Sequence, residues 1–495
     1  MSELKTIDKE YIANTYARFP VELVCGKGSL VYDETGREYI DMGSGIGVTA
    51  FGIADDEWKA AVTEQLGKLQ HMSNLYFTEP CAMLAKLLCE KTGMKKVFFC
   101  NSGAEANEGA IKAARKYAAE KKGPEYFTIV TLENSFHGRT LTTLAATGQA
   151  HYHELFQPLT PGFVHAPAND LEAVKNAALQ NKAAAVLIEC IQGEGGVIPL
   201  QKDFVTGLAD FCKEEDILLM VDEVQTGNGR TGELYAYMNF GVQPDVISTA
   251  KGLGGGLPLG AVLYGEKTEF TLGAGDHGST FGGNPVCCAG ALSILKRIDE
   301  NLLADVKKKS AMVFAALRGA PGVESVSGMG LMIGIKTAKP ASDVVKACME
   351  NGVLCLTAKG LGGGLPLGAV MFGEKTEFTL GAGDHGSTFG GNPVCCAGAL
   401  SILKRIDEKL LSDVKKKSAM AFEALQGAPG VESVSGMGLM IGIKTVKPAS
   451  DVVKACMENG VLCLTAKDKV RLLPALNIPE DVLMKAINVI KGACA

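Results

Sequence analysis

A long internal repeat constrains the fold of this chain more than any other feature of its sequence. Residues 251–358 recur as residues 359–466, and the two copies differ at only eight of 108 positions. Solenoid repeats are shorter units that stack on one another, whereas this repeat is long, nearly exact and present only twice. We interpret it as a tandem duplication, or an error of sequence assembly, inside a protein of 387 residues, because removing 108 residues from 495 leaves that length. Two nearly identical segments could therefore occupy the same positions in the fold, namely those that a single copy of the repeat would take.

The composition is that of a globular protein with a large core. The chain has 495 residues, of which 47% are hydrophobic and 21% charged, so two or three domains are expected. A net charge of −6 gives no electrostatic case for binding nucleic acid or an anionic membrane. No apolar run reaches transmembrane length and the first residues contain no apolar core, so we expect a cytoplasmic protein. The 15 cysteines include no C-x-x-C pattern, and we expect reduced core thiols and no metal site.

Strands and helices alternate along the first half of the chain. This order indicates an α/β fold, with a mainly parallel sheet covered by helices on both faces and a smaller α/β domain. The expected parts are an N-terminal segment that contributes to the small domain, a large domain, a small domain, the duplicate, and a tail that completes the small domain. They span residues 1–50, 51–306, 307–358, 359–466 and 467–495, respectively.

Two buried strands end on groups that suit one cofactor. The apolar run 246–250 is followed by Lys251 and a glycine-rich turn, and the apolar run 217–221 is followed by Asp222. A lysine at the end of a buried strand is costly unless it is neutral, paired or covalently engaged, so Lys251 is a candidate for Schiff-base formation. An amine and a carboxylate at neighbouring strand ends are what pyridoxal phosphate requires of a protein.

Other motifs follow strands in the same way. The strand 97–100 leads through residues 101–107 into a helix, which is typical of a phosphate site but equally of an ordinary capping box between Ser102 and Glu105. Phe136 and Arg139 follow the next strand and suit a flat ring and a carboxylate. Ligands of parallel sheets gather at the carboxyl ends of the strands, where all these motifs lie.

Together these motifs resemble those of the class III, fold-type I pyridoxal-phosphate aminotransferases. The resemblance covers the whole chain except one copy of the repeat. The matching stretches are residues 15–21, 101–107, 136–140, 222–225, 250–252, 279–285 and 470–474.

The resemblance implies how the cofactor is held. Lys251 would attach to it covalently, Asp222 would keep its pyridine nitrogen protonated, and Phe136 would stack on its ring. Thr280 would reach the phosphate of a partner subunit, which implies a homodimer. The residues expected to bind the cofactor are Ser102, Gly103, Ala104, Phe136, Asp222, Glu223, Val224, Gln225, Lys251 and Thr280.

It also implies a reaction. Arg139 would bind the substrate's α-carboxylate, Glu194 would act as a switch between the two substrates, Ser279 would contact the amino donor, and Arg471 would bind the second substrate's carboxylate. The implied reaction transfers the amino group of N-acetylornithine to 2-oxoglutarate, giving N-acetylglutamate 5-semialdehyde and glutamate in arginine biosynthesis.

Three alternatives remain open at this level. The first is another pyridoxal-phosphate enzyme of the same fold, because a fold does not determine chemistry. It would be a transaminase of ornithine, succinyl-diaminopimelate or 4-aminobutyrate, or a semialdehyde mutase. The second is a nucleotide-binding oxidoreductase, suggested by the glycines of 252–256, although these lack the G-x-G-x-x-G spacing into a helix. The third is a non-catalytic protein inactivated by the duplication.

The repeat raises the question of which copy forms the site. Lys359, Ser387 and Thr388 are the second-copy counterparts of Lys251, Ser279 and Thr280. We expect Lys251 and Thr280 to form the site, because opening the packed sheet beside Lys251 would leave backbone groups unpaired. We further expect the displaced copy to pack as an appended, partly disordered α/β piece, and the small unit of the second copy to pair with the strand that carries Arg471.

Overall fold

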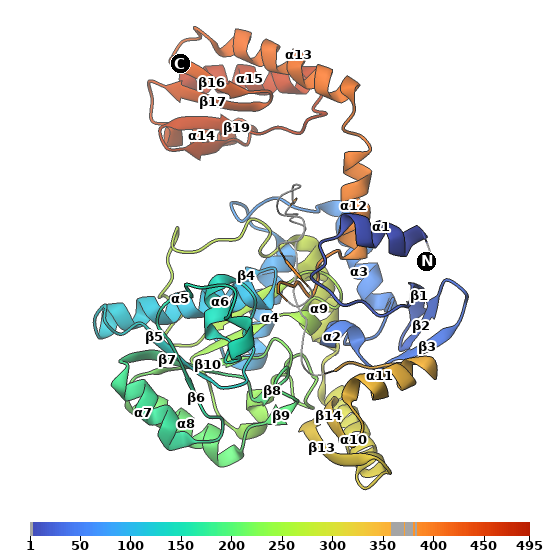
Figure 1. Cartoon of the computed structure of the whole chain (residues 1–495). Coiled ribbons are helices and arrows are strands. Elements are labelled where there is room, and N and C mark those ends of the chain that lie inside the picture. Colours follow the sequence, from blue (N-terminus) through green and yellow to red (C-terminus); the bar gives the residue numbers. More distant parts are fainter. Residues whose placement is uncertain (1–2, 358–370, 372–379, 382–383) are drawn as a thin grey trace. The chain divides into compact units, whose positions relative to one another are not determined.

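The computed structural model describes residues 3–357, 371, 380–381 and 384–495 (Figure 1). The chain forms two compact units, Met1–Asn392 and Pro393–Ala495. The division falls inside the second copy of the repeat and differs from the boundaries expected from the sequence.

A seven-stranded sheet forms the centre of the first unit. Its strands, in spatial order, are β4 (Lys96–Cys100), β12 (Gly260–Tyr264), β11 (Val246–Thr249), β10 (Leu218–Asp222), β7 (Ala183–Ile188), β5 (Thr128–Leu132) and β6 (Phe163–Ala166). Strand β12 is antiparallel to both of its neighbours, and the pairings from β11 to β6 are parallel. The expected mainly parallel sheet is confirmed.

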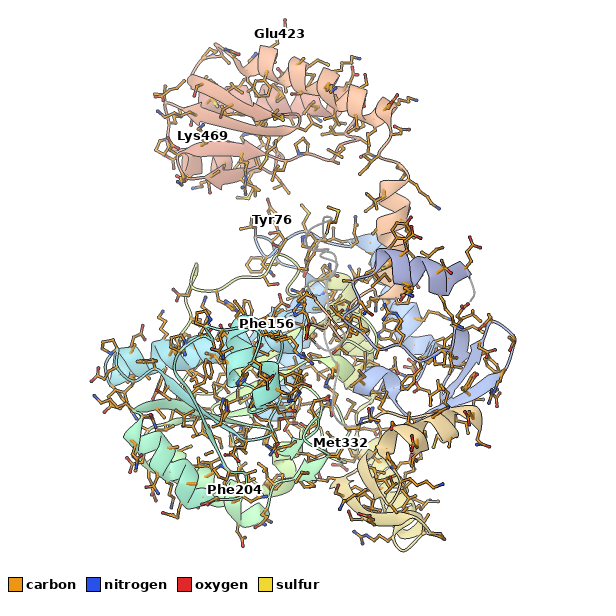
Figure 2. All side chains as sticks on the ribbon, in the orientation of Figure 1. Tyr76, Phe156, Phe204, Met332, Glu423 and Lys469 are labelled. Atoms are coloured by element: carbon orange, nitrogen blue, oxygen red, sulfur yellow. The ribbon has the colours of Figure 1, made fainter. Side chains whose placement is uncertain are left out.

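Helices cover both faces of this sheet, because its central strands are apolar on both sides. In β10, Leu218 and Met220 belong to one buried cluster, whereas Leu219 and Val221 belong to the other. The first face is covered by α5 (Gly103–Lys121) and α6 (Leu141–Ala146). The second is covered by α4 (Glu79–Thr92), α7 (Leu171–Gln180), α8 (Lys202–Glu214) and α9 (Pro285–Arg297), and Phe204 of α8 lies in its core (Figure 2).

Smaller elements surround the sheet. Strands β1 (Leu23–Lys27), β2 (Leu30–Asp33), β3 (Glu38–Asp41) and β15 (Val353–Leu354) form a second sheet. Two hairpins are β8 (Ile191–Gln192) with β9 (Ile198–Pro199), and β13 (Val323–Met329) with β14 (Met332–Thr337). The remaining helices are α1 (Glu3–Tyr11), α2 (Ser44–Gly47), α3 (Asp56–Lys68), α10 (Glu300–Leu317), α11 (Ala341–Glu350) and the short 3₁₀ turns Ala150–Tyr152, Ala236–Phe240 and Lys251–Leu253.

The first-copy hairpin β13–β14 belongs to the first unit because polar contacts attach it to the large domain. Ser327 Oγ donates to the carbonyl oxygen of Val197 at 2.8 Å, and Leu331 N donates to that of Arg230 at 2.9 Å. Strand β15 extends the N-terminal sheet by pairing in parallel with β3. The expected boundary at 306/307 therefore does not separate two compact units.

The second unit combines the second copy with the tail. Its elements are α12 (Pro393–Leu403), α13 (Glu408–Leu425), β16 (Val431–Met437), β17 (Met440–Thr445), α14 (Ala449–Glu458), β18 (Leu464–Ala466), β19 (Lys469–Leu472) and α15 (Glu480–Cys494). Strand β17 pairs with β19, which places Gly442 opposite Arg471. The second copy therefore pairs with the strand of Arg471, as expected, and the unit has its own buried core.

Within the part of the chain that the structure describes, no helix has both the length and the apolar character needed to cross a membrane.

Candidate active site

The site lies at the carboxyl ends of the parallel strands of the large sheet. Strands β10 and β11 run side by side with Asp222 opposite Ser248, and Lys251 follows three residues later. Phe136 and Arg139 follow β5, and Glu189 follows β7 directly. Parallel strands with similar registers bring their ends to one edge, which explains why motifs far apart in the sequence meet here.

Lys251 is held in a buried and strained conformation. Its side chain is only 8% exposed, and its backbone φ of +46° lies in the left-handed region, which is rare for residues other than glycine. Burial lowers the pKa of the Lys251 amine, and the negative charges of Glu194, Asp222 and Glu189 oppose that shift. A lowered pKa increases the neutral fraction of the amine, which is the form that acts as a nucleophile or base.

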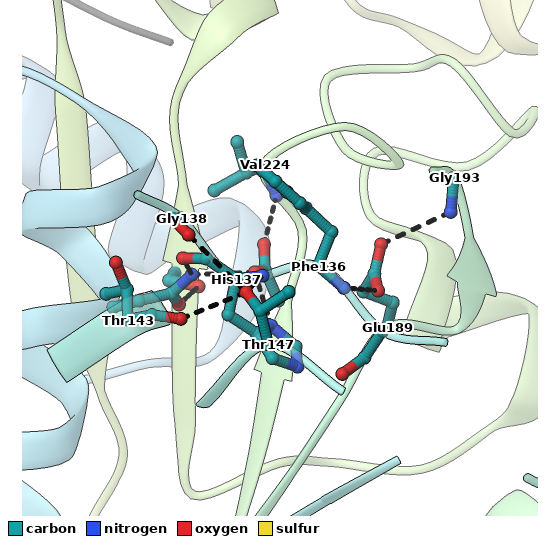
Figure 3. A network of polar contacts seen from close by, with 12 residues as sticks. Phe136, His137, Gly138, Thr143, Thr147, Glu189, Gly193 and Val224 are labelled. Atoms are coloured by element: carbon teal, nitrogen blue, oxygen red, sulfur yellow. Dashed lines mark hydrogen bonds and ion pairs between the residues drawn. The ribbon is translucent and has the colours of Figure 1, made fainter. Parts of the chain in front are cut away.

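Asp222 is fixed by three donors, two of which belong to His137 and Val224, labelled in Figure 3. Its Oδ2 accepts hydrogen bonds from Asn107 Nδ2 at 2.7 Å and from His137 Nδ1 at 2.9 Å, and its Oδ1 accepts from Val224 N at 3.0 Å. The side chains of Asp222 and His137 are buried. The carboxylate is therefore held in one orientation at the end of its strand.

Asn107 and His137 connect this carboxylate to the surrounding elements. Ser248 Oγ of β11 donates to Asn107 Oδ1 at 2.6 Å, and Thr147 Oγ1 accepts from His137 N at 2.9 Å. Asn107 and His137 lie within the matching stretches 101–107 and 136–140, but neither was predicted as a site residue. A usable signal existed, because Asn107 is a polar residue on the small-residue face that α5 buries against the sheet.

The start of α5 is a suitable anion seat. Ser102 caps the helix, since its Oγ accepts from Glu105 N at 3.1 Å, and Glu105 Oε2 accepts from Asn101 N at 2.8 Å. The N–H groups of Gly103 and Ala104 belong to the first turn, where an α-helix provides no intrahelical acceptor. A Cβ on Gly103 would lie 2.6 Å from a methyl carbon of Val224, so only glycine lets this helix start approach the residues after Asp222.

An arginine and two aromatic rings form another part of the site. The guanidinium carbon of Arg139 lies 4.0 Å from the ring centroid of Tyr152 and 5.6 Å from that of Phe136. Arg139 is 7% exposed, and burial lowers the pKa of its guanidinium. Arginine in such a setting suits a planar carboxylate. Tyr152 was not identified from the sequence.

Two further carboxylates have distinct environments. Glu189 accepts from Phe136 N at 2.9 Å and from Gly193 N at 3.2 Å, and burial raises its pKa to about 7. Glu223 is fully buried and accepts from Thr226 Oγ1 and Tyr237 N, and burial raises its pKa to about 7 as well. These bonds hold the Glu223 carboxylate within the core, and its role toward the cofactor stays a prediction.

The structure describes most of the other predicted residues. Gln225 Nε2 donates to Glu194 Oε1 at 3.4 Å, and Ser279 Oγ accepts from Asn101 Nδ2 at 2.8 Å, whereas Thr280 is exposed. Arg471 lies on β19 in the second unit. Lys359 is outside the described residues, whereas the other two second-copy counterparts, Ser387 and Thr388, are described and are half-buried in the first unit.

Comparison with known proteins agrees with this geometry. The profile of the family "Aminotransferase class-III" matches twice, over residues 11–358 and 354–494. An acetylornithine aminotransferase of Haemophilus ducreyi is 51% identical over 359 residues, which cover 72% of this chain and 91% of that protein. One of Methanocaldococcus jannaschii is 45% identical over 353 residues, covering 70% and 88%.

Solved structures give the same family. The ornithine aminotransferase of Toxoplasma gondii has a TM-score of 0.58 and 25% identity, covering 99% of this chain and 94% of that one. The N-acetylornithine aminotransferase of Stenotrophomonas maltophilia has a TM-score of 0.53 and 27% identity, covering 99% and 97%. With both family matches and relatives of this similarity, the chain belongs to the class-III aminotransferases.

Proposed function

We propose that this protein is a pyridoxal-phosphate-dependent transaminase that transfers the amino group of N-acetylornithine to 2-oxoglutarate. The products are N-acetylglutamate 5-semialdehyde and glutamate. The observation that carries the proposal is the pairing of a buried Lys251 amine of lowered pKa with an Asp222 carboxylate fixed by His137 and Asn107. The donor follows from the names of the curated relatives, which are acetylornithine aminotransferases.

The residues present fit the cofactor. Lys251 would hold it covalently, and Asp222 would face the pyridine nitrogen, since its second oxygen is already oriented by His137 Nδ1 and Asn107 Nδ2. The first-turn N–H groups of Gly103 and Ala104 would hold the phosphate. When bound, pyridoxal phosphate supplies an electron-accepting ring that stabilises negative charge at the substrate's α-carbon.

The protein's own groups would perform the remaining work. The Lys251 amine would take up the proton that leaves the substrate's α-carbon and would release the same proton later in the reaction. Its lowered pKa favours this role at neutral pH, because more of the amine is then neutral. Arg139 would bind the α-carboxylate in a bidentate pair. Glu194 would act as the switch between the two substrates, and Ser279 would contact the donor. The role expected of Arg471, which lies on β19 in the second unit, stays a prediction.

Ornithine remains the alternative donor. Solved ornithine and N-acetylornithine aminotransferases resemble this chain in fold at similar identities, 25% and 27%, so fold similarity does not distinguish the two donors. An acyl group is recognised by the shape of the pocket, so a comparison of rates is the decisive measurement. A homodimer and a cytoplasmic location remain predictions.

Borohydride reduction of the protein loaded with pyridoxal phosphate, followed by tryptic mapping, tests the proposal. A reduced lysine resists trypsin, so a label on Lys251 appears in the peptide 231–267 and one on Lys359 appears in the peptide 347–375. We expect the label in the first peptide and its loss in a Lys251→Ala variant. A label on Lys359 alone would reject the assignment.

Steady-state rates on acetylornithine, ornithine, succinyl-diaminopimelate and 4-aminobutyrate test the substrate. We expect the highest kcat/KM with acetylornithine. A higher value with any of the other three donors would replace it as the substrate. A protein that carries the label on Lys251 but turns over none of the four would be a cofactor-binding protein without transaminase activity.

A further inference from the structure

A short segment of the second copy is docked on the first unit. Residues 384–392 belong to that unit, whereas the chain from Pro393 onward forms the other. Tyr16 Oη donates to the carbonyl oxygen of Ser387 at 2.9 Å and also accepts from Ser387 N. Asn392 Nδ2 donates to the carbonyl oxygen of Gly256 at 2.8 Å, in the glycine-rich turn that follows Lys251.

The same segment inserts an aromatic side chain beside the active site. Phe389 is only 4% exposed and packs against Val48 in a small apolar cluster. Val48 follows Gly47, and a methyl group added to Gly252 would lie 3.5 Å from the carbonyl oxygen of Gly47. Phe389 is therefore seated on the wall that flanks Lys251. We call Tyr16, Val48 and Gly256 the loop seat.

Charge also connects the segment to the site. Burial lowers the pKa of His385, and the positive charge of Arg139 lowers it further. Burial lowers the pKa of Arg139 itself, and the negative charge of Asp384 is among the groups that oppose this shift. Both residues at the start of the segment therefore lie within electrostatic range of the arginine that would bind the substrate's carboxylate.

The first copy carries the same nine residues in a different place. Residues 276–284 and 384–392 are identical in sequence. In the first copy, Ser279 is bonded to Asn101 and Asn74, and Asn284 caps α9. Phe281 is 44% exposed, against 4% for its counterpart Phe389. The segment that binds the loop seat thus occurs twice in each chain. Residues 384–392 are docked on the seat, whereas residues 276–284 lie elsewhere with Phe281 exposed.

We propose that the second-copy segment 384–392 occupies the loop seat of its own chain and completes the wall of the active site there, with Thr388 in place of the Thr280 of another chain. Two segments of one sequence can fill the seat, and the covalently tethered one has an effective concentration on the order of millimolar. The first-copy loop of a second chain is thus excluded. The role of Thr388 toward the cofactor's phosphate rests on the proposed function, whereas the docking does not.

Photocrosslinking of the full-length chain tests the docking directly. Tyr16 is replaced by p-benzoylphenylalanine, and the protein is irradiated with and without pyridoxal phosphate. An exposed Ser401→Ala change marks the second-copy peptide 376–404, which is otherwise identical to the first-copy peptide 268–296. We expect a crosslink to the marked peptide in a product of single-chain mass, 51.9 kDa. A product of twice that mass, a crosslink to the unmarked peptide, or no crosslink to either would overturn the proposal.

The repeat offers a matched pair of variants for the second measurement. Phe389→Ala removes the buried anchor of the segment, and Phe281→Ala removes the exposed counterpart. We expect Phe389→Ala to abolish the crosslink and to weaken retention of pyridoxal phosphate about tenfold or more, because the anchor is buried. Phe281→Ala should change neither. Equal effects of the two variants would contradict docking within the chain.

Cofactor labelling and crosslinking test the proposed function and the docking of the segment separately. If the unmodified protein binds no cofactor, the proposed function fails, and the crosslink in the cofactor-free protein still decides whether the segment docks. If the cofactor binds and labels Lys251 but no crosslink forms to the marked peptide, the docking fails and the proposed function stands.

Discussion

At the residue scale, the site depends on how neighbouring groups set the charge of a few side chains. Three donors hold the carboxylate of Asp222 in place at the end of β10. Lys251 stays buried because three carboxylates compensate part of the cost of its burial. The chemistry of the site is thus determined by partners from other elements rather than by the catalytic residues alone.

Replacement of Asp222 by asparagine tests this arrangement. We expect Asp222→Asn to retain the cofactor but to lower the rate of transamination by more than about tenfold, or roughly 1.4 kcal/mol in transition-state stabilisation. The reason is that an amide cannot stabilise a protonated pyridine nitrogen as a carboxylate does. Rates and the bound-cofactor absorption are measured together, and a rate within tenfold of the wild type would show that Asp222 does not have this role.

Glu189 predicts a pH dependence of stability. Its pKa of about 7 in the folded protein exceeds the ordinary value of 4.5, so folding favours the protonated form. Its contribution is fully present below about pH 4.5 and is lost as the pH rises through about 7. We expect the Tm of the wild type, relative to that of Glu189→Gln, to fall between pH 5 and about 7.5. A difference in Tm that does not change over this range would contradict the raised pKa.

At the element scale, identical strands differ in burial. Ile443 in β17 is fully buried, whereas its counterpart Ile335 in β14 is 45% exposed. The difference arises because β19 pairs with β17, whereas among the described strands β14 pairs only with β13. The tail strand therefore makes the second copy, and not the first, into a four-stranded sheet with a core.

This difference predicts unequal effects of the same substitution. We expect Ile443→Ala to destabilise the second unit by about 2–5 kcal/mol, because it opens a cavity in a packed core. Ile335→Ala should cost less than about 1 kcal/mol, because the side chain is half in water already. Urea unfolding of the full chain with both variants gives the comparison. Similar losses of stability would mean that β14 is covered in solution.

At the scale of the whole molecule, the duplication places two copies of the small unit on one chain that has a single tail. The first copy is attached to the large domain through β13, β14 and β15, and the second is completed by β19. The first copy thus makes the contacts to the large domain, and the second makes the contacts to the tail. A single small domain would make both.

Deletion of residues 359–466 should reunite these contacts. We expect the shortened chain to fold with the tail strand paired to 332–337, because that segment has the same sequence as β17. The physical reason is that, once β17 is deleted, β14 is the one remaining strand with the sequence that pairs with β19. Hydrogen exchange of the amides in 332–337 measures it, with protection expected to rise above that in the full chain. Unchanged exchange together with a protease-sensitive tail would reject this prediction.

The sequence by itself determined the large domain and the main chemistry. Apolar runs of strand length end at Asp222 and Lys251, and the Ser102–Glu105 capping pattern predicts the helix start, because these features are local. Asn107, His137 and Tyr152 converge only in three dimensions, since they come from a helix, a loop and a 3₁₀ turn. Nor could the sequence assign the two copies, because identical residues such as Phe281 and Phe389 encode the same preferences. Their neighbours differ, and burial by those neighbours is decided only by the tertiary structure.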